Sequence, residues 1–431
     1  MSSLLAKLKQ LATFSRELKV SIEQRTLQQD LDAYKAYMML LYHKNHRHLP
    51  LSDRPALRTR SKEERDASTN FNSRRHRRMA QRLAAVQVAE LLRCLHELPL
   101  ERRLALDPFP EEAAATAPPR RLPEGEEERA REKERRDQIL CDRLLRLGER
   151  VEREFPHPSG HFSVQLRTST IPHPDSGLGV YIKGHAIPGT VLGFYGGVTH
   201  LPHRLTRGVR EGNAHYYYVR RDNLLVDGRE WERLNMRIRN GEDPLDVLGH
   251  ERRSSAIDTD STTALLKFRN PFAIGQYINH APGERRPNAM CYQFDFTSKA
   301  PLSKELLAYA PNIYSSPPSL FDRVILGGGG PLSLLSLLSQ KNNLLRQGAI
   351  VIATSHIRDE EVFLNYGLNP NNEEWPEWYV DPDPEATKRL WAKLPHHEWM
   401  QKAVQRQLDG GKIDEQAKGN EGKEAEMKKE D

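Results

Sequence analysis

The sequence contains few cysteines and no long apolar stretch. Cys94, Cys141 and Cys291 are the three cysteines among 431 residues, and they lie far apart along the chain. This spacing excludes a disulfide framework and a cysteine-rich zinc site, and it fits a reducing compartment. No run approaches the roughly eighteen apolar residues that a membrane-spanning helix needs. The sequence therefore predicts an intracellular protein without a bound metal and without a membrane span.

The sequence also has little excess charge of either sign. The formal net charge of +6 is small for a chain of this length, so it gives little support for a nucleic-acid partner. Arg74 to Arg78 form the clearest basic run, but no aromatic residues are interleaved with it as in single-strand binding surfaces. Such a run occurs in nuclear-import and phosphate-binding segments, and more often it is a solvated face. The composition therefore argues against nucleic acid as the partner.

The N-terminal segment leaves the compartment open. No acidic residue precedes Glu17, and apolar residues recur at helical spacing at Leu4, Leu8, Leu11, Leu18 and Ile22. This pattern is typical of an amphipathic mitochondrial presequence. A surface helix that packs on a domain would show the same pattern. We therefore expect the nucleus or the cytoplasm, with the mitochondrion as the alternative.

Two regions with different patterns follow one another along the chain. Apolar residues at helical spacing predict an α-helical N-terminal region over residues 1–112. Residues 113–159 read as an alanine- and proline-rich linker followed by a charged helix. Short apolar runs broken by Gly, Pro or Asn extend over residues 160–367, and they predict an antiparallel, mostly β domain. Residues 368–431 form a C-terminal segment with a Lys/Glu-rich tail that we expect to be disordered.

Six short apolar runs predict the strands of this domain. They are Val180–Lys183, Val191–Tyr195, Tyr216–Val219, Leu224–Val226, Ala289–Phe296 and Ala349–Ile352. The third and fourth runs predict a hairpin that turns at Asp222-Asn223. Residues 230–267 are charged and serine-rich, and residues 315–347 include four consecutive glycines. We expect both stretches to be surface insertions.

Three separated segments carry residue types that suggest a binding site. The first contains Ser176-Gly177-Leu178-Gly179 and, after the next strand, Tyr195-Gly196-Gly197; the second contains Asn279-His280 and then Pro287-Asn288; the third is Glu360-Glu361-Val362-Phe363-Leu364-Asn365-Tyr366. Each is weak evidence by itself. A G-x-G is usually a tight turn, Asn-His a capped turn, and a lone Tyr a core residue with a satisfied hydroxyl.

Together, and in this order, the segments resemble the SET domain of protein lysine methyltransferases. The family pattern is a G-x-G turn, a strand ending in Y-x-G, an N-H followed by P-N, and E-E-L-x-x-x-Y, and this chain has all four between His161 and Gly367. Within the family the chain is most similar to the SET domain-containing protein 9 group, through Asn270 to Tyr277 and Leu306 to Ile313. The resemblance implies small antiparallel sheets around a knot-like crossing, preceded by the helical region.

The resemblance also implies a cofactor and roles for particular residues. The cofactor is S-adenosylmethionine, bound by Gly177, Leu178, Gly179, Asn279, His280 and Tyr366. Tyr366 would direct its hydroxyl at the transferring methyl, and Tyr195 and Tyr292 would line the lysine channel. The implied function is methyl transfer to a lysine side chain of a protein substrate. Because the sulfonium activates the leaving group, the protein must chiefly hold amine, methyl carbon and sulfur in line, and no metal is needed.

Two departures from the family pattern leave a second function open. Six residues, Ala281 to Arg286, separate the N-H from the P-N, where the family usually has three. The zinc-binding cysteine cluster that follows many SET domains is missing. Trp375, Trp378 and Tyr379 would either close the site in its place or dock the tail. The alternative is therefore a catalytically weak or inactive SET-derived module, which acts as a scaffold through its helical N-terminus.

Overall fold

The computed structural model describes the helical and sheet-forming parts of the chain. The described residues are 30–50, 73–97, 153–173, 176–200, 217–220, 222, 224–240, 242–248, 261–283, 285–315, 344–368, 378–385 and 387. The predictions for the N-terminal segment, the linker, the charged helix, the four-glycine run, Trp375 and the Lys/Glu-rich tail lie outside these residues. The chain forms two compact units, residues 1–80 with 383–431 and residues 81–382.

In the first unit, two helical segments pack through aromatic rings. Residues 30–46 form a helix, and α3 (Ser73–Glu97) begins in this unit. The ring centroids of Tyr34 and Tyr37 lie 5.4 Å and 5.3 Å from that of His76. Burial, with the nearby charge of Arg75, lowers the pKa of His76 to about 4, so the imidazole between the tyrosines is neutral near pH 7. The helices expected in the N-terminal region are confirmed for these segments.

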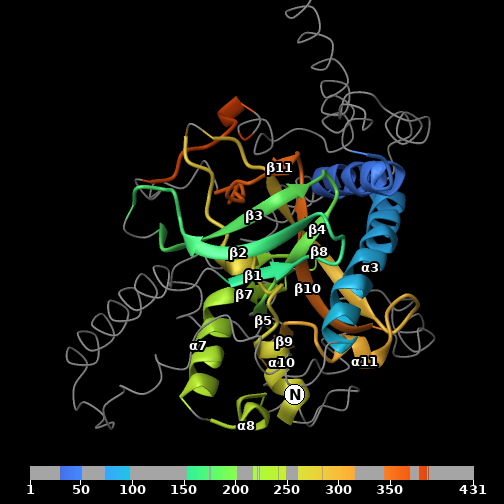
Figure 1. Ribbon diagram of the computed structural model, residues 1–431, viewed down its shortest axis with the longest axis vertical. Helices are drawn as coiled ribbons and strands as arrows, with labels where there is room; N and C mark the ends of the chain where they lie inside the picture. Colours follow the sequence, from blue (N-terminus) through green and yellow to red (C-terminus); the bar gives the residue numbers. More distant parts are fainter. Residues whose placement is uncertain are drawn as a thin grey trace, which may run out of the picture. The chain divides into compact units, whose positions relative to one another are not determined.

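The second unit contains three small sheets (Figure 1). In sheet order, the first consists of β1 (Arg153–Pro156), β2 (Phe162–Thr168), β3 (Leu178–Ala186) and β11 (Ile357–Arg358); the second of β4 (Val191–Tyr195), β10 (Leu344–Ala353) and β8 (Ala289–Thr297); the third of β6 (Tyr217–Val219), β7 (Leu225–Asp227), β5 (Gly197–His200) and β9 (Asn312–Tyr314). Among the described strands, each neighbouring pair is antiparallel except β5 with β9, which is parallel. The six predicted strands and the β6–β7 hairpin are confirmed, with bounds that differ by a few residues.

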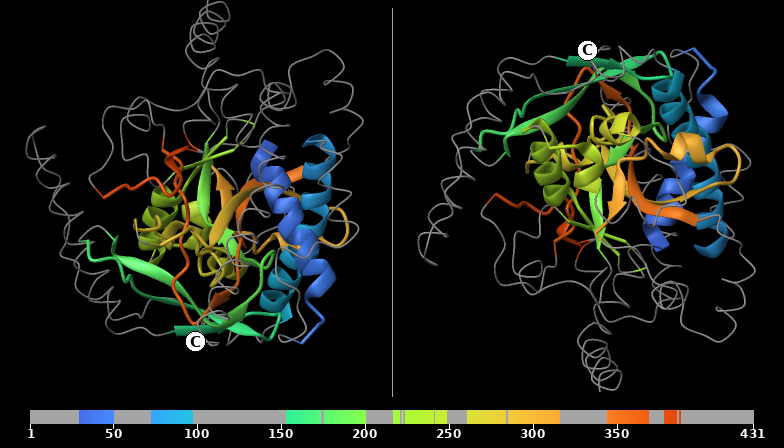
Figure 2. Two further views of the ribbon diagram at one scale, coloured as in Figure 1. Left: turned by 90° about the horizontal axis from the view of Figure 1, so that it is seen from above. Right: turned by 90° about the horizontal axis from the view of Figure 1, so that it is seen from below.

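The stretch 230–267, expected to be a surface insertion, contains helices. They are α7 (Gly228–Arg239), α8 (Pro244–Leu248) and α10 (Ser261–Phe268), which Figure 2 shows gathered together. Trp231, Leu234 and Ile238 recur at helical spacing among charged residues, and they are buried in one cluster with Phe268. One apolar stripe of this kind is enough to dock a helix. The expectation of a mostly β domain is therefore confirmed only in part: the small, mainly antiparallel sheets are present, and helices are combined with them in a mixed α/β arrangement.

Helix α3 continues into the second unit beyond Ala80, and there its side-chain amides pair with strand backbones. Gln81 donates to the carbonyl oxygen of Asp295 at 2.7 Å and accepts from its N–H at 3.1 Å. Gln87 donates to the carbonyl oxygen of Gly189 and accepts from the N–H of Val191, both at 2.9 Å. Each amide thus takes the place of a neighbouring strand and satisfies backbone groups on β8 or at the start of β4.

The main hydrophobic core joins the first two sheets to the segments that carry the predicted site. Its members include Val164, Val180, Ile182, Leu192, Ile274, Ile278, Val351, Val362 and Leu364. Tyr277, Cys291 and Tyr366 are partly buried and pack against this cluster. The core therefore sets the positions of the second and third motif segments. Among the described helices, none combines the length and the apolar character needed to cross a membrane.

Candidate functional site

Gly177 immediately precedes β3 and Gly179 is its second residue. The structure requires glycine at these two positions for different reasons. Gly177 has φ +50°, in the left-handed region that favours glycine, and a Cβ there would meet open space. A Cβ on Gly179 would instead lie 2.8 Å from Cδ of Glu361 and overlap with its carboxylate. The space that Gly179 leaves is therefore filled by a protein side chain. The family resemblance had implied that Gly179 contacts the cofactor.

Asn279 joins this glycine turn to the second and third segments. Its side-chain amide donates to the carbonyl oxygen of Leu178 at 3.0 Å. Its own carbonyl oxygen accepts from the N–H of Leu364 at 2.9 Å, and the N–H of Ala281 donates to the carbonyl oxygen of Leu364 at 3.0 Å. The three motif segments, far apart in the sequence, therefore meet at Asn279.

Asn288, in the Pro-Asn part of the motif, holds the third segment from the other side. Its amide donates to the carbonyl oxygen of Glu361 at 2.9 Å and accepts from the N–H of Phe363 at 2.7 Å. Between His280 and Asn288, the guanidinium carbon of Arg285 lies 5.5 Å from the ring centroid of Phe363. The longer loop thus begins and ends in contacts with the third segment, and its extra residues do not separate the paired segments.

His280 is 4% exposed, and both ring nitrogens have partners. Nε2 lies 2.8 Å from the carbonyl oxygen of Val380, and Nδ1 lies 3.3 Å from the N–H of Tyr366. Because a carbonyl oxygen only accepts and an N–H only donates, the ring hydrogen belongs on Nε2. Burial lowers the pKa of His280, although its hydrogen bonds to backbone groups oppose this shift. The imidazole is therefore neutral near pH 7 and adds no positive charge beside Tyr366.

Tyr366 is half-buried, and its hydroxyl has a defined partner. The hydroxyl donates to the carbonyl oxygen of Ile278 at 3.1 Å, while the ring packs on the main core. The ring centroid of Tyr366 lies 5.4 Å from that of His280 and 6.1 Å from that of Trp378. The ring planes of Tyr366 and Trp378 meet at 89°. These contacts hold both the ring plane and the hydroxyl oxygen in one place.

The described part of the C-terminal aromatic segment lies against the same two residues. The ring of Tyr379 stacks on His280 with centroids 4.4 Å apart and planes at 19°. The Tyr379 hydroxyl accepts from the N–H of Leu368 at 3.1 Å, and burial raises the pKa of Tyr379 to about 12. Trp378 contacts Tyr366 as described above. Trp378 and Tyr379 therefore contact His280 and Tyr366. These contacts are compatible both with closing the site and with docking the tail.

Strand register separates the two tyrosines that were expected to line a channel. Tyr195 pairs with Ala349 of β10, whereas Tyr292 pairs with Ile350, the next residue of the same strand. Cross-strand partners project from the same face, and successive residues project from opposite faces. Tyr195 and Tyr292 therefore lie on opposite faces of this sheet, and the structure does not bring Tyr292 (3% exposed) to Tyr195.

Cys291 lies on the same face of the sheet as Tyr195. It packs against the cluster of Tyr195, Val226 and Ala349, and also against the main core on which Tyr366 packs. The resemblance to the SET family implied the neighbouring Tyr292 instead. The sequence signal that points to it is the alternation along β8 of Tyr292, Phe294 and Phe296 with Cys291, Gln293 and Asp295, which places Cys291 on the face opposite the aromatic rings.

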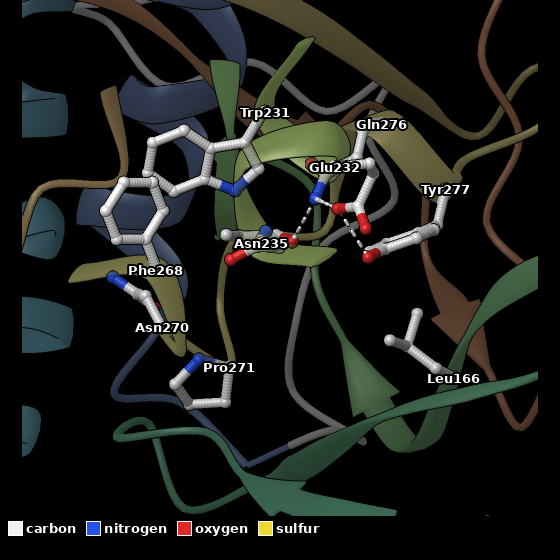
Figure 3. A pocket seen from close by; sticks show the side chains of 10 residues that line it. Leu166, Trp231, Glu232, Asn235, Phe268, Asn270, Pro271, Gln276 and Tyr277 are labelled. Atoms are coloured by element: carbon white, nitrogen blue, oxygen red, sulfur yellow. Dashed lines mark hydrogen bonds between the residues drawn. The ribbon is translucent and has the colours of Figure 1, made fainter. Parts of the chain in front are cut away.

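A small cavity with both polar and apolar lining lies beside α7 (Figure 3). The cavity has a volume of about 10 Å³. The residues that line it are Leu166, Trp231, Glu232, Asn235, Phe268, Asn270, Pro271, Ala273, Gln276 and Tyr277. The carboxylate of Glu232 accepts from the Tyr277 hydroxyl at 2.6 Å and from the Gln276 amide at 3.3 Å. A cavity of this size suits about one water molecule and is too small for a nucleoside. We therefore assign it to the packing of α7.

Comparison with known proteins identifies two proteins whose sequences are similar to part of this chain. Two proteins called SET domain-containing protein 9, from Pongo abelii and Homo sapiens, are each 31% identical to this chain over 156 residues. The chain is similar to SET domain-containing protein 9. The match covers 35% of this chain and 52% and 48% of the two relatives, so the chain spans about half the length of the relatives it matches. No family model and no solved structure matches the chain.

The likeness to SET domain-containing protein 9 confirms the resemblance predicted from the four motifs. The structure adds that Leu178, Asn279, His280 and Tyr366 lie together. Within the described part of the chain, no group of three or more His, Cys, Asp or Glu side chains could hold a metal ion.

Proposed function

We propose that this chain binds S-adenosylmethionine and transfers its methyl group to a lysine side chain of a protein substrate. The observation that carries the proposal is the meeting of the three motif segments, in which Asn279 bonds to Leu178 and Tyr366 bonds to Ile278 and His280. The similarity to SET domain-containing protein 9 supports the same class of function. In this proposal the SET domain covers residues 160–367.

The residues at the meeting point fit a sulfonium cofactor. The backbone around Gly177 and Leu178, with the half-exposed amide of Asn279, offers donors and acceptors for its polar ends. His280 would support its adenine end through the main chain, and the neutral ring does not repel a sulfonium cation. When bound, the cofactor supplies a methyl group already activated by the positively charged sulfur.

Tyr366 is the residue that we assign to the transferring methyl. Its hydroxyl donates its hydrogen to Ile278, and a hydroxyl oxygen that donates can still accept through its lone pairs. It can therefore accept weak C–H···O bonds from a methyl group that carries partial positive charge. Orientation of this kind contributes roughly 7–11 kcal/mol in well-aligned reactions.

Tyr195 and Cys291 are the residues that we assign to the approach of the lysine. Lysine has a pKa of about 10.4 in water, so only about one in a thousand is neutral near pH 7. The apolar surroundings of Tyr195 and Cys291 would lower that pKa by desolvation and so favour the neutral amine. Tyr292 has no part in this proposal, because it projects from the other face of the sheet.

The test is incubation of the purified chain with methyl-labelled S-adenosylmethionine and a whole-cell protein extract, followed by hydrolysis to identify labelled methyl-lysine. The wild-type chain and Tyr314→Phe should label lysine at similar rates, and Tyr366→Phe should label it about ten- to a thousandfold more slowly. Tyr314 is a suitable control because its hydroxyl also makes a hydrogen bond, at 3.0 Å to Gln347. Cofactor binding without transfer to any protein would favour the scaffold function, and a wild-type chain that binds no cofactor would refute the proposal.

A further inference from the structure

Glu361 carries a buried carboxylate that several hydrogen-bond donors surround. The residue is 1% exposed. Its Oε1 accepts from the Ser169 hydroxyl at 2.7 Å, and its Oε2 accepts from the N–H and the hydroxyl of Thr170 at 2.8 Å and 2.5 Å. The Tyr181 hydroxyl lies 3.0 Å from Oε2 and 2.9 Å from the carbonyl oxygen of Thr168, and its one hydrogen is shared between these two acceptors. A carboxylate is costly to bury unless hydrogen bonds replace its water, and these four donors do so.

The Tyr181 hydroxyl, on β3, stays protonated. Burial, with the charge and hydrogen bond of Glu361, raises the pKa of Tyr181 to about 12. The guanidinium carbon of Arg167 lies 3.9 Å from the centroid of the Tyr181 ring, an arrangement that favours a cation over its face. Tyr181 therefore keeps its hydroxyl hydrogen at physiological pH, and the contact between β3 and Glu361 persists.

The backbone of Glu361 belongs to the segment that carries Tyr366. Its carbonyl oxygen accepts from the Asn288 amide, and the N–H of the next residue, Val362, donates to the carbonyl oxygen of Val180 at 2.7 Å. The side chain reaches back under Gly179, where a Cβ would overlap with it. One residue thus connects the segment after β2, the glycine turn and the segment that carries Tyr366.

We infer that Glu361 is a positioning residue that holds residues 169–173 and 176–179 in the conformation required for cofactor binding, and this inference rests on the proposed function. The carboxylate fixes Ser169 and Thr170 at one end of this segment and fills the space beside Gly179 at the other. The carbonyl group of Leu178, which accepts from Asn279, is adjacent to Gly179. Glu361 therefore acts through the glycine turn and does not itself contact the reacting atoms.

The test compares Glu361→Gln with Glu360→Gln, which removes the same charge from the exposed neighbouring side chain. Glutamine replaces one acceptor oxygen by an NH₂ group that faces donors. In Glu361→Gln, amide exchange in residues 169–173 and 176–179 should become about tenfold faster, and the Kd for S-adenosylmethionine should rise about tenfold. Methyl transfer at saturating cofactor should recover most of the wild-type rate, because only the turn is displaced. Glu360→Gln should match the wild type in all three measurements.

A second variant keeps the inference testable if Glu361→Gln does not fold. Thr170→Val removes one donating hydroxyl at an exposed position and keeps the backbone N–H. It should raise the cofactor Kd by about threefold, with unchanged kcat at saturation. Unchanged cofactor affinity in every folded variant, beside normal binding by the wild type, would overturn the role of Glu361 alone. A wild-type chain that binds no cofactor would overturn the proposed function as well.

Discussion

The side-chain amide of Asn279 donates a 3.0 Å hydrogen bond to the backbone carbonyl oxygen of Leu178, 101 positions earlier in the chain. This bond links the glycine turn to the segment that pairs with Leu364. Asn279→Ala would leave the carbonyl oxygen without this donor and should weaken S-adenosylmethionine binding by roughly 1–3 kcal/mol. Calorimetry would measure the affinity, with the exposed Asn240→Ala as the control. Equal affinity in the two variants would remove Asn279 from the cofactor site.

Replacing Tyr366 by Phe separates a catalytic role from a packing role. The change keeps the ring and removes the hydroxyl that donates to Ile278, so stability should fall by about 0.5–1.5 kcal/mol. If the hydroxyl acts on the methyl, the single-turnover rate should also fall about ten- to a thousandfold, as for loss of one preorganised polar group. Cofactor affinity should change little. A lower melting temperature with an unchanged rate would leave Tyr366 as a core residue.

The two glycines should respond differently to alanine. Gly179→Ala would push a Cβ into the Glu361 carboxylate, which four donors hold in place, and should cost about 1–3 kcal/mol through overpacking. Gly177→Ala meets no neighbour and should cost about 1–2 kcal/mol through its φ of +50°. Gly177→Asn should recover part of that loss, because Asn tolerates this conformation. Denaturant titration would measure each, and wild-type stability of Gly179→Ala would contradict the packing described.

His157 should make stability depend on pH on the acid side of neutrality. Burial lowers its pKa to about 4, although its hydrogen bond to the Val191 carbonyl oxygen opposes this shift. The unfolded state therefore takes up a proton at higher pH than the folded state. The free energy of unfolding therefore does not depend on His157 protonation above a pH of about 6.5. As the pH falls from there toward 4, the free energy of unfolding decreases by roughly 3 kcal/mol in all.

His157→Phe isolates this contribution from that of the carboxylates. Phenylalanine keeps the stacking on Phe162, whose ring centroid lies 4.3 Å from that of His157, and cannot titrate. The variant should be about 1–3 kcal/mol less stable at pH 7.5, because the Val191 carbonyl oxygen loses its donor. The difference from the wild type should shrink or reverse at pH 4.5. Denaturant midpoints at both values would show this, and a constant difference would contradict it.

Cys291 allows a test of the route assigned to the lysine. Phenylalanine at this position would fill space beside Tyr195 and the core that contacts Tyr366, so transfer to protein should fall at least about tenfold while cofactor affinity is kept. Cys291→Ala is the matched control, because it enlarges the same space and should retain transfer. Equal rates in the two variants would place the lysine route elsewhere.

The strands could be predicted because their signal is local. A short apolar run bounded by Gly, Pro or Asn, such as Val191–Tyr195, predicts a strand without reference to any partner. Helix α7 was missed because charged residues separate its buried side chains. Trp231, Leu234 and Ile238 become a stripe only at helical spacing, and their composition alone suggested a surface stretch.

The candidate site could be predicted only as a set of residue types in order. Tyr195, Asn279, His280 and Tyr366 were selected from four motifs whose combination is specific, although each motif alone is weak. Tyr292 was selected by analogy with the family, as a second residue of the lysine channel. Its face of the sheet depends on the register with β10, and a shift of one residue exchanges the two faces.

The sequence by itself determined the order of the motif segments, most of the strands and the resemblance to a SET domain, because these depend on near neighbours along the chain. Only the tertiary structure decided that Cys291 faces Tyr195, that Glu361 fills the space beside Gly179, and that burial lowers the pKa of His280. Each of these results depends on contacts between residues distant in sequence. Strand register, packing and burial determine those contacts, and no local pattern contains them.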